Sequence, residues 1–468
     1  MKYYINSFVL SIGLSIILCA TVLAEDSVRA SISPISQSNK RHSEFVVPAG
    51  LRKRVDFWID IFTKYGKYNL VIHHRRFPQI VFKVLDLSRA GLELNEAQFG
   101  YFKKEIEQKK VAEIQTIIKK LSLGEEPSND LEQHIADVMA DVYGAGLEKY
   151  KVTLDEDLVR TQTGIKERYE DAIKRAGRYM NQMEDIFQKE SLPVELTRLP
   201  YIESSFDYSA YSSVGAAGIW QFMRSTGSKY LLINSMVDER LDPLAASFAA
   251  TKYLSHAREV LPSWPLAVTS YNHGITGVKR KVAEAGTENI SDMIERKGGE
   301  PVFGFASSNF YPELLAAIEV HDSYKEYFPD LVPDRSIQYR DQVLTRAMSV
   351  KEAADIFNTD AELLKRVNYA LNPKVWQGGI IPAGYKLKIP VKGLVDMASP
   401  TIDIPVFKEA KQKKTVTKYK HASKAKDSKK VGKGKKVELI PIKKSAAKVV
   451  QKTNTKKKKA LKKIIKKK

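Results

Sequence analysis

Lysine is concentrated at one end of this chain of 468 residues, and this limits which part of it can fold around a core. Residues 408–468 hold 26 Lys but only 3 Asp or Glu, with little aromatic content. Because the whole chain carries a formal net charge of +21, the rest of it is close to neutral. A segment this basic cannot bury enough apolar surface to offset its chain entropy. We therefore predict a disordered basic tail at 408–468, preceded by globular domains.

The first 24 residues are predicted to be a signal peptide. Lys2 precedes an almost wholly apolar run at 8–23, and Val22-Leu23-Ala24 fits the small-residue cleavage rule. An uncleaved anchor is an alternative, although the run is shorter than the roughly 20 residues that a spanning helix needs. A lipoprotein signal at Cys19 is a third interpretation, disfavoured by Leu18 before it. The predicted location is the periplasm or cell envelope, with membrane association left open.

Cys19 is the only cysteine, so removal of the signal peptide would leave none. The mature protein would then have no intramolecular disulfide and no thiol nucleophile. Cysteine-based metal sites would be excluded as well.

Two regions follow before the densest part of the sequence. Residues 25–47 are polar and rich in Ser, and we interpret them as a flexible leader. Residues 48–190 are predicted to be mostly helical, because apolar residues recur there at helical spacing. The expected elements are a buried helix at 55–62, strands at 69–74 and 79–87, and long helices at 96–121 and 155–189.

A compact, mainly α-helical domain is predicted at 191–330, where aromatic and small residues are dense and Gly- and Ser-containing turns separate helical segments. Helices are expected at 245–260, 265–269 and 311–324. A smaller α/β unit at 337–391 has the order strand, helix, helix, strand. Ser349 and Glu352 form a Ser-x-x-Glu capping-box pattern at the start of its first helix. The predicted fold class is therefore mainly α.

Glu203 is the candidate catalytic residue. It lies between the apolar Tyr201-Ile202 and Phe206. Apolar surroundings disfavour the charged form of a carboxyl and raise its pKa. A raised pKa is what a general acid working near neutral pH requires.

Residues suited to a sugar-binding groove follow this acid. The aromatic ones, which offer flat surfaces for sugar rings, are Trp220, Phe222 and Tyr271. Gln221 and Asn272 offer directed hydrogen bonds, and the glycines of Gly215-x-x-Gly218 allow backbone to approach a bulky ligand. A packed helical core with glycine turns would use the same residues. Residue chemistry alone leaves both interpretations open.

Four ordered boxes resemble the soluble lytic transglycosylase catalytic domain, glycoside hydrolase family 23. They are Glu203-Ser204-Ser205-Phe206, Ser212-Ser-Val-Gly-Ala-Ala-Gly218 with Ile219-Trp-Gln221, Asp238-Glu-Arg-Leu-Asp-Pro243, and Tyr271-Asn-His-Gly274. The resemblance covers residues 192–317 and implies a lysozyme-like catalytic domain. The upstream helix through Tyr169 and Tyr179 is similar to that of the membrane-bound branch of this family.

The resemblance implies that Glu203 first protonates the oxygen linking N-acetylmuramic acid to N-acetylglucosamine. Glu203 then acts as a base on the muramoyl 6-hydroxyl, which closes on C1 and gives a 1,6-anhydro end. One carboxylate serves both steps, so the usual second carboxylate of glycosidases need not be present. Ser212, Gln221, Tyr271 and Asn272 fall on family positions that line the glycan groove. The implied partner is the peptidoglycan glycan strand, and no metal or organic cofactor is expected.

The sequence departs from the family pattern at two places. Tyr208 replaces a Pro that often follows the first box. In a late box, Ala306, Ser308 and Phe310 stand where many members have Glu, Arg and Tyr, so a hydroxyl and an ion pair are missing unless Tyr311 substitutes. The alternative functions are a non-catalytic peptidoglycan-binding or scaffold protein, and a lysozyme-type hydrolase on the same fold.

The unit at 337–391 resembles a LysM glycan-binding module. The order of its elements, Asn368 after the second helix and the ending Ile381-Pro-Ala-Gly-Tyr-Lys-Leu-Lys-Ile-Pro390 carry the likeness. Thr345-Arg346 stands near the usual Gly-Asp start of the first loop. A structural cap on the enzyme domain is the alternative interpretation.

The basic tail is predicted to contact anionic envelope surfaces, such as lipid head groups or wall polymers. Lysine runs bind phosphates by charge without reading sequence, and specific nucleic-acid binding is not expected in an exported protein. Residues 459–468 include Leu461 and Ile464 and are compatible with a short amphipathic helix at such a surface. A solvated tail that aids solubility is the alternative. The sequence predicts no particular oligomeric state.

Overall fold

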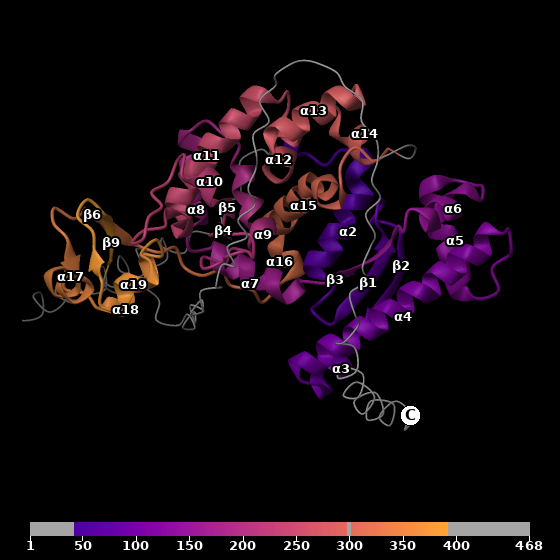
Figure 1. The fold of residues 1–468 in the computed structure, drawn as a ribbon, viewed down its shortest axis with the longest axis horizontal. Coiled ribbons are helices and arrows are strands. Elements are labelled where there is room, and N and C mark those ends of the chain that lie inside the picture. Colours follow the sequence, from indigo (N-terminus) through magenta and orange to yellow (C-terminus); the bar gives the residue numbers. More distant parts are fainter. Residues whose placement is uncertain (1–41, 297–300, 392–468) are drawn as a thin grey trace, which may run out of the picture. The chain divides into compact units, whose positions relative to one another are not determined.

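The computed structural model describes residues 42–296 and 301–391, and these residues are predominantly helical (Figure 1). The prediction of a mainly α fold is confirmed. The predicted signal peptide and basic tail lie outside the described residues. Within the described ranges, no helix combines the length and the apolar character that a membrane span requires.

Folded structure begins before the predicted end of the leader at residue 47. Ser43–Phe45 forms a 3-10 helix (η1), and the Phe45 side chain is fully buried. The Glu44 carboxylate accepts a hydrogen bond from the backbone N–H of Trp264 at 3.0 Å. The buried Phe45 ring therefore holds the end of the segment predicted to be a flexible leader against the core.

A helix and a three-stranded antiparallel sheet open the fold. A 3-10 turn (η2, Ala49–Leu51) leads into α2 (Arg52–Thr63), whose buried face is the predicted one. β1 (Asn69–His74) is the central strand, with β2 (Val81–Asp86) and β3 (Val159–Thr163) on its two edges. The two predicted strands are confirmed, and the third was not expected.

The single helix predicted at 155–189 is wrong. The chain forms β3 there, followed by α7 (Lys166–Ala176) and α8 (Met180–Lys189). Thr161 pairs with Ile72 of β1, so a β-branched residue has the strand environment it favours. A Cβ at Gly164 would lie 2.1 Å from the Tyr65 carbonyl oxygen, so the chain makes a close turn here that only glycine fits. Pairing with a distant strand overrides the helical pattern.

Four helices lie between β2 and β3 in the chain, and the last three of them pack around a second hydrophobic core. They are α3 (Ser88–Glu93), α4 (Glu96–Ser122), α5 (Asp130–Tyr143) and α6 (Glu148–Asp155). α4 confirms the predicted helix, and Asn95 and Gln98 form a capping box at its start. Ile114 and Ile118 of α4 pack with buried Phe82 of β2. This contact connects these helices with the three-stranded sheet.

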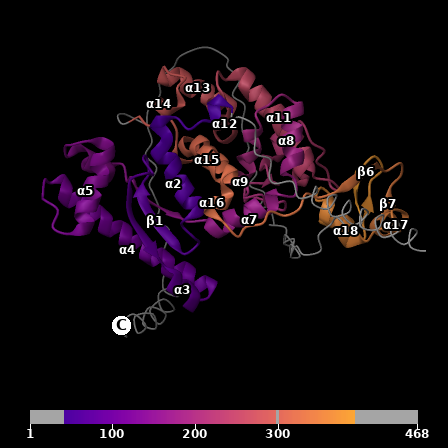
Figure 2. The ribbon, with the colours of Figure 1, turned by 180° about the vertical axis from the view of Figure 1, so that it is seen from behind.

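The central region consists of short turns and a group of packed helices. Its elements are η3 (Val194–Arg198), α9 (Leu199–Glu203), β4 (Ala216–Ala217), β5 (Phe222–Met223), α10 (Arg224–Gly227), η4 (Glu239–Leu241), α11 (Pro243–Val260), α12 (Trp264–His273), α13 (Ile275–Ala285), α14 (Ile290–Ile294), α15 (Phe305–Asp322) and α16 (Tyr324–Tyr327). The predicted helices correspond to α11, α12 and α15. α15 packs against α2, α12 and α9, and it lies beside α2 and α12 in both ribbon views (Figures 1 and 2). This largely buried helix therefore connects the N-terminal part with the central region.

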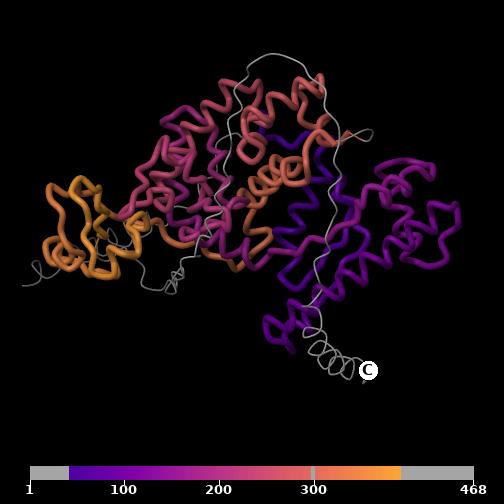
Figure 3. Tube along the Cα trace, viewed as in Figure 1, coloured from indigo at the N-terminus to yellow at the C-terminus, as the bar shows by residue number. Residues whose placement is uncertain are grey.

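The unit at 337–391 has a small core of its own. Its elements are β6 (Tyr339–Val343), β7 (Met348–Ser349), α17 (Val350–Ile356), α18 (Ala361–Val367), α19 (Pro373–Trp376), β8 (Ile380–Ile381) and β9 (Lys386–Pro390). β6 pairs with β9 and β7 with β8. The path of the chain through this unit is drawn in orange in Figure 3. The four predicted elements are present as β6, α17, α18 and β9, whereas β7, α19 and β8 were not predicted. The Ser349 side chain caps α17, but Glu352 pairs with Arg346, so only half of the capping box forms.

Candidate active site

Glu203 is the last residue of α9, the short helix that follows η3. Pro200 stands in the first turn, where a missing backbone N–H costs nothing. Tyr201 and Phe206 on either side are buried, whereas the Glu203 side chain is partly exposed. No hydrogen bond or ion pair reaches its carboxylate from the residues that the structure describes. The carboxyl is thus enclosed by apolar groups but still accessible.

The turn after the candidate acid holds two residues in the left-handed backbone region. φ is 55° at Ser205 and 54° at Phe206, values that non-glycine residues rarely adopt. Arg175 of α7 donates hydrogen bonds to both carbonyl oxygens, at 2.7 and 3.2 Å. The Ser204 hydroxyl donates to the Ile219 carbonyl at 3.0 Å, which joins the first sequence box to the second. Strain of this kind, fixed by surrounding bonds, is typical of functional sites.

The predicted rise in the pKa of Glu203 is confirmed. Burial is the largest cause and raises this pKa from 4.5 to about 8, since a charged carboxylate loses its hydration in an apolar setting. The negative charge of Glu313, when that residue is ionised, contributes a smaller part of this rise. At neutral pH the Glu203 carboxyl therefore carries its proton.

Glu313, on α15, is a site residue that the sequence analysis missed. Burial raises its own pKa to about 8, and the positive charge of Arg160 opposes that rise. Arg160 reaches α15 from β3, with its guanidinium carbon 3.5 Å from the centroid of the Phe305 ring. Because Arg160 favours the ionised form of Glu313, this carboxyl is the one of the pair that loses a proton first. Its only sequence signal was an acid within the apolar stretch from Phe310 to Ala317.

Substitution of Glu313 by Gln is expected to lower the pKa of Glu203, because the variant removes a negative charge that disfavours ionisation of Glu203. The Glu203 carboxyl then loses its proton at a lower pH. An NMR titration of labelled side-chain carboxyls measures this change without assuming any activity. Glu319→Gln is the matched control, since Glu319 lies on the same helix and pairs with Arg52 at 2.9 Å. An unchanged Glu203 titration in Glu313→Gln would contradict the coupling.

Trp220 and Phe222 do not provide the flat sugar-binding surfaces suggested by the sequence. Both side chains are buried, and Trp220 stacks on Phe187 with ring centroids 5.7 Å apart. The Trp220 indole N–H donates to the Ser247 hydroxyl at 2.9 Å. These rings belong to the core beneath the site, because packing against α8 and α11 buries them completely.

Ser212 and Gln221 are both partly exposed, and both contact the backbone of the loop that carries them. The Ser212 hydroxyl accepts from the backbone N–H of Ala216 at 2.9 Å, which closes the turn before β4. The Gln221 amide nitrogen donates to the Gly218 carbonyl at 2.8 Å, and φ at Gln221 is 49°. The structure therefore fixes the position of both side chains beside the short β4–β5 hairpin.

Tyr271 and Asn272 stand at the end of α12 with their side chains held by neighbours. The Tyr271 hydroxyl donates to the Trp220 carbonyl at 2.8 Å. Burial, together with the charge of Glu203, raises the pKa of Tyr271, so these two predicted residues act on each other electrostatically. The Asn272 side-chain oxygen accepts from the Ser307 hydroxyl at 2.8 Å, while the residue itself stays exposed. The fourth box therefore reaches the same site as Glu203.

The segment that contains these boxes matches a known family. Residues 179–294 match the family described as the transglycosylase SLT domain. This segment of the chain is therefore similar to the transglycosylase SLT domain. The SLT match begins near the start of α8 and ends at the end of α14, so α15 with Glu313 lies beyond it.

Two curated relatives are similar to this chain in sequence. The chain is 28% identical over 201 residues to "Membrane-bound lytic murein transglycosylase D" of Escherichia coli strain K12, covering 42% of this chain and 44% of the relative. It is 30% identical over 111 residues to a "Putative tributyltin chloride resistance protein" of Alteromonas sp. strain M-1, covering 23% and 54%. The chain spans about half the length of these curated relatives.

A solved structure, the complex of the 70-kDa soluble lytic transglycosylase with bulgecin A, was also found by the structural comparison. It is 13% identical in sequence, with a TM-score of 0.28, and the match covers 64% of this chain and 56% of that one.

The altered late box beyond the SLT match is part of the packing around the site. Phe310 stacks on Tyr271, with ring centroids 6.3 Å apart and an interplanar angle of 7°. Tyr311 does not take the place of the missing tyrosine, because it is fully buried and donates its hydroxyl to the Glu44 carbonyl. Tyr208 is likewise buried, and its hydroxyl donates to the Arg175 carbonyl. An aromatic contact therefore stands where the family pattern has a hydroxyl.

The Asp-x-Arg-x-Asp-Pro box, which lies within the SLT match, supports the β4–β5 hairpin. Buried Arg240 pairs with Asp238 at 2.7 Å and donates to the carbonyls of Gly215 and Phe222, at 2.8 and 3.0 Å. Asp242 accepts hydrogen bonds from the first N–H groups of α11 and so caps this helix. The box acts as a scaffold for the segment that carries Gln221.

Proposed function

We propose that this chain is a peptidoglycan lytic transglycosylase that cleaves the β-1,4 bond between N-acetylmuramic acid and N-acetylglucosamine. The observation that carries the proposal is a carboxyl, Glu203, that burial keeps protonated at neutral pH and that lies within the SLT match. A relative named as a lytic murein transglycosylase supports the same substrate class.

In the proposed reaction Glu203 acts twice. Its proton passes to the glycosidic oxygen as the bond from that oxygen to muramoyl C1 breaks. The carboxylate so formed takes the proton of the muramoyl 6-hydroxyl while O6 bonds to C1, which leaves a 1,6-anhydro end and restores protonated Glu203. No water is consumed, and no second nucleophile is needed. Burial of Glu203 favours the protonated state in which the cycle begins.

The proposed glycan groove is lined by Ser212, Gln221, Tyr271 and Asn272. Each of these four side chains has a polar atom bonded to a protein partner, so little conformational entropy is lost when they are ordered around a sugar. Exposed Asn272 is the residue among them with the freest access to a ligand.

We also propose that the unit at 337–391 is a LysM-like module that binds the same glycan. Buried Asn368 supports the likeness, because it accepts from the Lys388 N–H at 2.9 Å and donates to the Lys388 carbonyl at 2.8 Å. These two bonds fix β9 to the end of α18. With the predicted signal peptide and basic tail, such a module would keep the enzyme on the wall of the cell envelope.

Digestion of purified sacculi, followed by mass spectrometry of the products, tests the proposed function. Anhydro-muropeptides are the expected products. Reducing muropeptides would indicate a lysozyme-type hydrolase instead. If the chain pelleted with sacculi but released nothing, it would be a binding or scaffold protein.

A further inference from the structure

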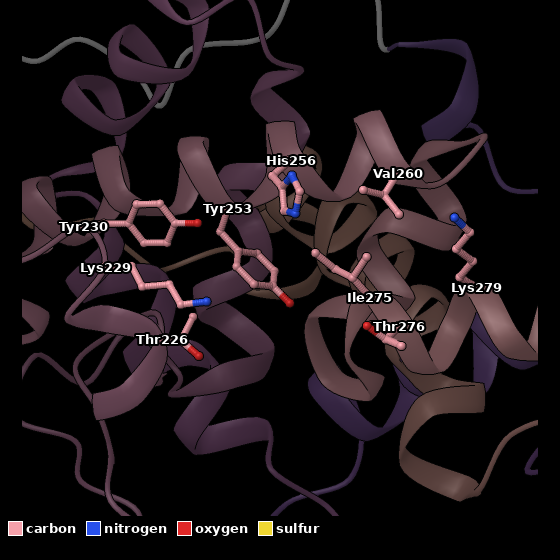
Figure 4. A pocket seen from close by; sticks show the side chains of 9 residues that line it. All are labelled: Thr226, Lys229, Tyr230, Tyr253, His256, Val260, Ile275, Thr276 and Lys279. Carbon is pink, nitrogen blue, oxygen red and sulfur yellow. The ribbon is translucent and has the colours of Figure 1, made fainter.

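A pocket of about 480 Å³ lies among α10, α11 and α13 (Figure 4). Lys229 and Thr226 lie on one side of it, Lys279 and Ile275 on the other, and Tyr253 stands between them. No acidic side chain lines the pocket. It thus combines hydroxyl, aromatic and aliphatic groups with two cationic side chains.

The pocket is adjacent to the candidate active site. Tyr253 contacts Tyr271 edge-on, with ring centroids 5.2 Å apart, and its hydroxyl donates to the Ser270 carbonyl at 3.4 Å. α13, which carries Lys279, begins directly after the Tyr271-Asn-His-Gly274 box. A substrate held at Tyr271 would therefore have the pocket next to it.

The two lysines of the pocket are not neutralised by the protein. Lys229 and Lys279 are exposed, and among the described residues neither makes an ion pair or a side-chain hydrogen bond. The next cations on α13 are different, since Arg280 and Lys281 both pair with Glu284, at 3.5 and 2.9 Å. Two uncompensated cations at the same pocket favour an anionic ligand.

We propose that this pocket binds the carboxylate-bearing peptide stem attached to the muramoyl residues of the substrate strand. The inference rests on the proposed function and adds to it a part of the substrate. N-acetylated sugar rings are neutral and call for stacking and hydrogen bonds, whereas peptide stems carry free carboxylates together with small apolar side chains. Lys229 and Lys279 match the carboxylates, and Ile275 and Tyr253 match the apolar groups.

The test compares two substrates: glycan strands that keep their peptides, and the same strands after an amidase has removed them. The double variant Lys229→Gln/Lys279→Gln is expected to lose about tenfold in kcat/KM on peptide-bearing strands, the effect of two partly exposed charge pairs. Its kcat/KM on stripped strands should equal that of the wild type. Because exposed ion pairs are screened, the loss should shrink as the salt concentration rises.

Two further variants make the comparison specific. Lys252→Gln/Lys281→Gln removes the same charge from α11 and α13, but these lysines pair with Glu190 and Glu284, so both substrates should be cleaved as by the wild type. Lys229→Arg/Lys279→Arg keeps the charges and should restore cleavage of peptide-bearing strands. Equal melting temperatures show that no variant acts through folding.

The outcomes separate this inference from the proposed function. If the wild type cleaves both substrates and Lys229→Gln/Lys279→Gln loses equally on both, the pocket holds glycan and the peptide assignment is overturned. No loss on either substrate also overturns it. If the wild type cleaves neither substrate, the proposed function fails and this inference falls with it.

Discussion

Replacement of Glu203 by Gln is expected to lower kcat for peptidoglycan cleavage by about a thousandfold, the order of magnitude that general acid–base catalysis supplies. The amide has nearly the shape of the protonated carboxyl but can neither give up a proton to the glycosidic oxygen nor take one from the 6-hydroxyl. Release of soluble muropeptides from sacculi, followed over time, measures the change.

The structure supplies a control for the Glu203 prediction. Glu190, just after the end of α8, pairs with Lys252 at 2.5 Å on the surface, and Glu190→Gln should leave the rate unchanged. Glu203→Gln should still pellet with sacculi, and its stability should not fall, because a neutral amide replaces a carboxyl that is already neutral at pH 7. Full activity in Glu203→Gln would remove the proposed mechanism.

Replacement of Gly218 by Ala is expected to destabilise the fold by about 3 kcal/mol or more, within the range of severe single substitutions. φ at Gly218 is 74°, and an added Cβ would lie 1.8 Å from the carbonyl oxygen of Arg240, so either the hairpin or the η4 turn must move. Urea denaturation measures the loss. Since the same movement displaces Gln221, we also expect weaker binding to sacculi.

Gly215 is the matched comparison for Gly218. Its φ is 90°, but a Cβ there would meet no atom within 4 Å. Gly215→Ala should therefore show only the cost of a left-handed alanine, about 1–2 kcal/mol. Equal losses in the two variants would show that backbone strain alone, rather than contact with Arg240, makes Gly218 necessary.

In the proposed mechanism, the surroundings of Glu203 keep the single acid protonated. Apolar burial supplies most of the rise in the pKa of Glu203, and a second carboxylate adds to it. Arg160 lowers the pKa of Glu313 and so decides which of the two ionises first. Arg160 lies on a strand of the N-terminal sheet, which gives that region a role at the site besides packing.

Much of the fold could be predicted from local patterns in the sequence. Helical periodicity located α2, α4 and α11, because the spacing of apolar residues along one helix does not depend on distant partners. The capping serine at 349 and the strand order of the unit at 337–391 are local in the same sense. The failure at 155–189 has the opposite cause: β3 exists only because β1, far away in sequence, accepts it as an edge strand.

For the candidate site, the sequence by itself determined the acid, its apolar neighbours and the order of the boxes, since these are properties of adjacent residues. Only the tertiary structure decided that Trp220 and Phe222 are core residues and that the Tyr311 hydroxyl donates to the Glu44 carbonyl. Only the tertiary structure, too, places Glu313 where its charge raises the pKa of Glu203, 110 positions away in the chain. Burial and electrostatic coupling depend on which segments pack together, and packing between distant segments leaves no fixed spacing in the sequence.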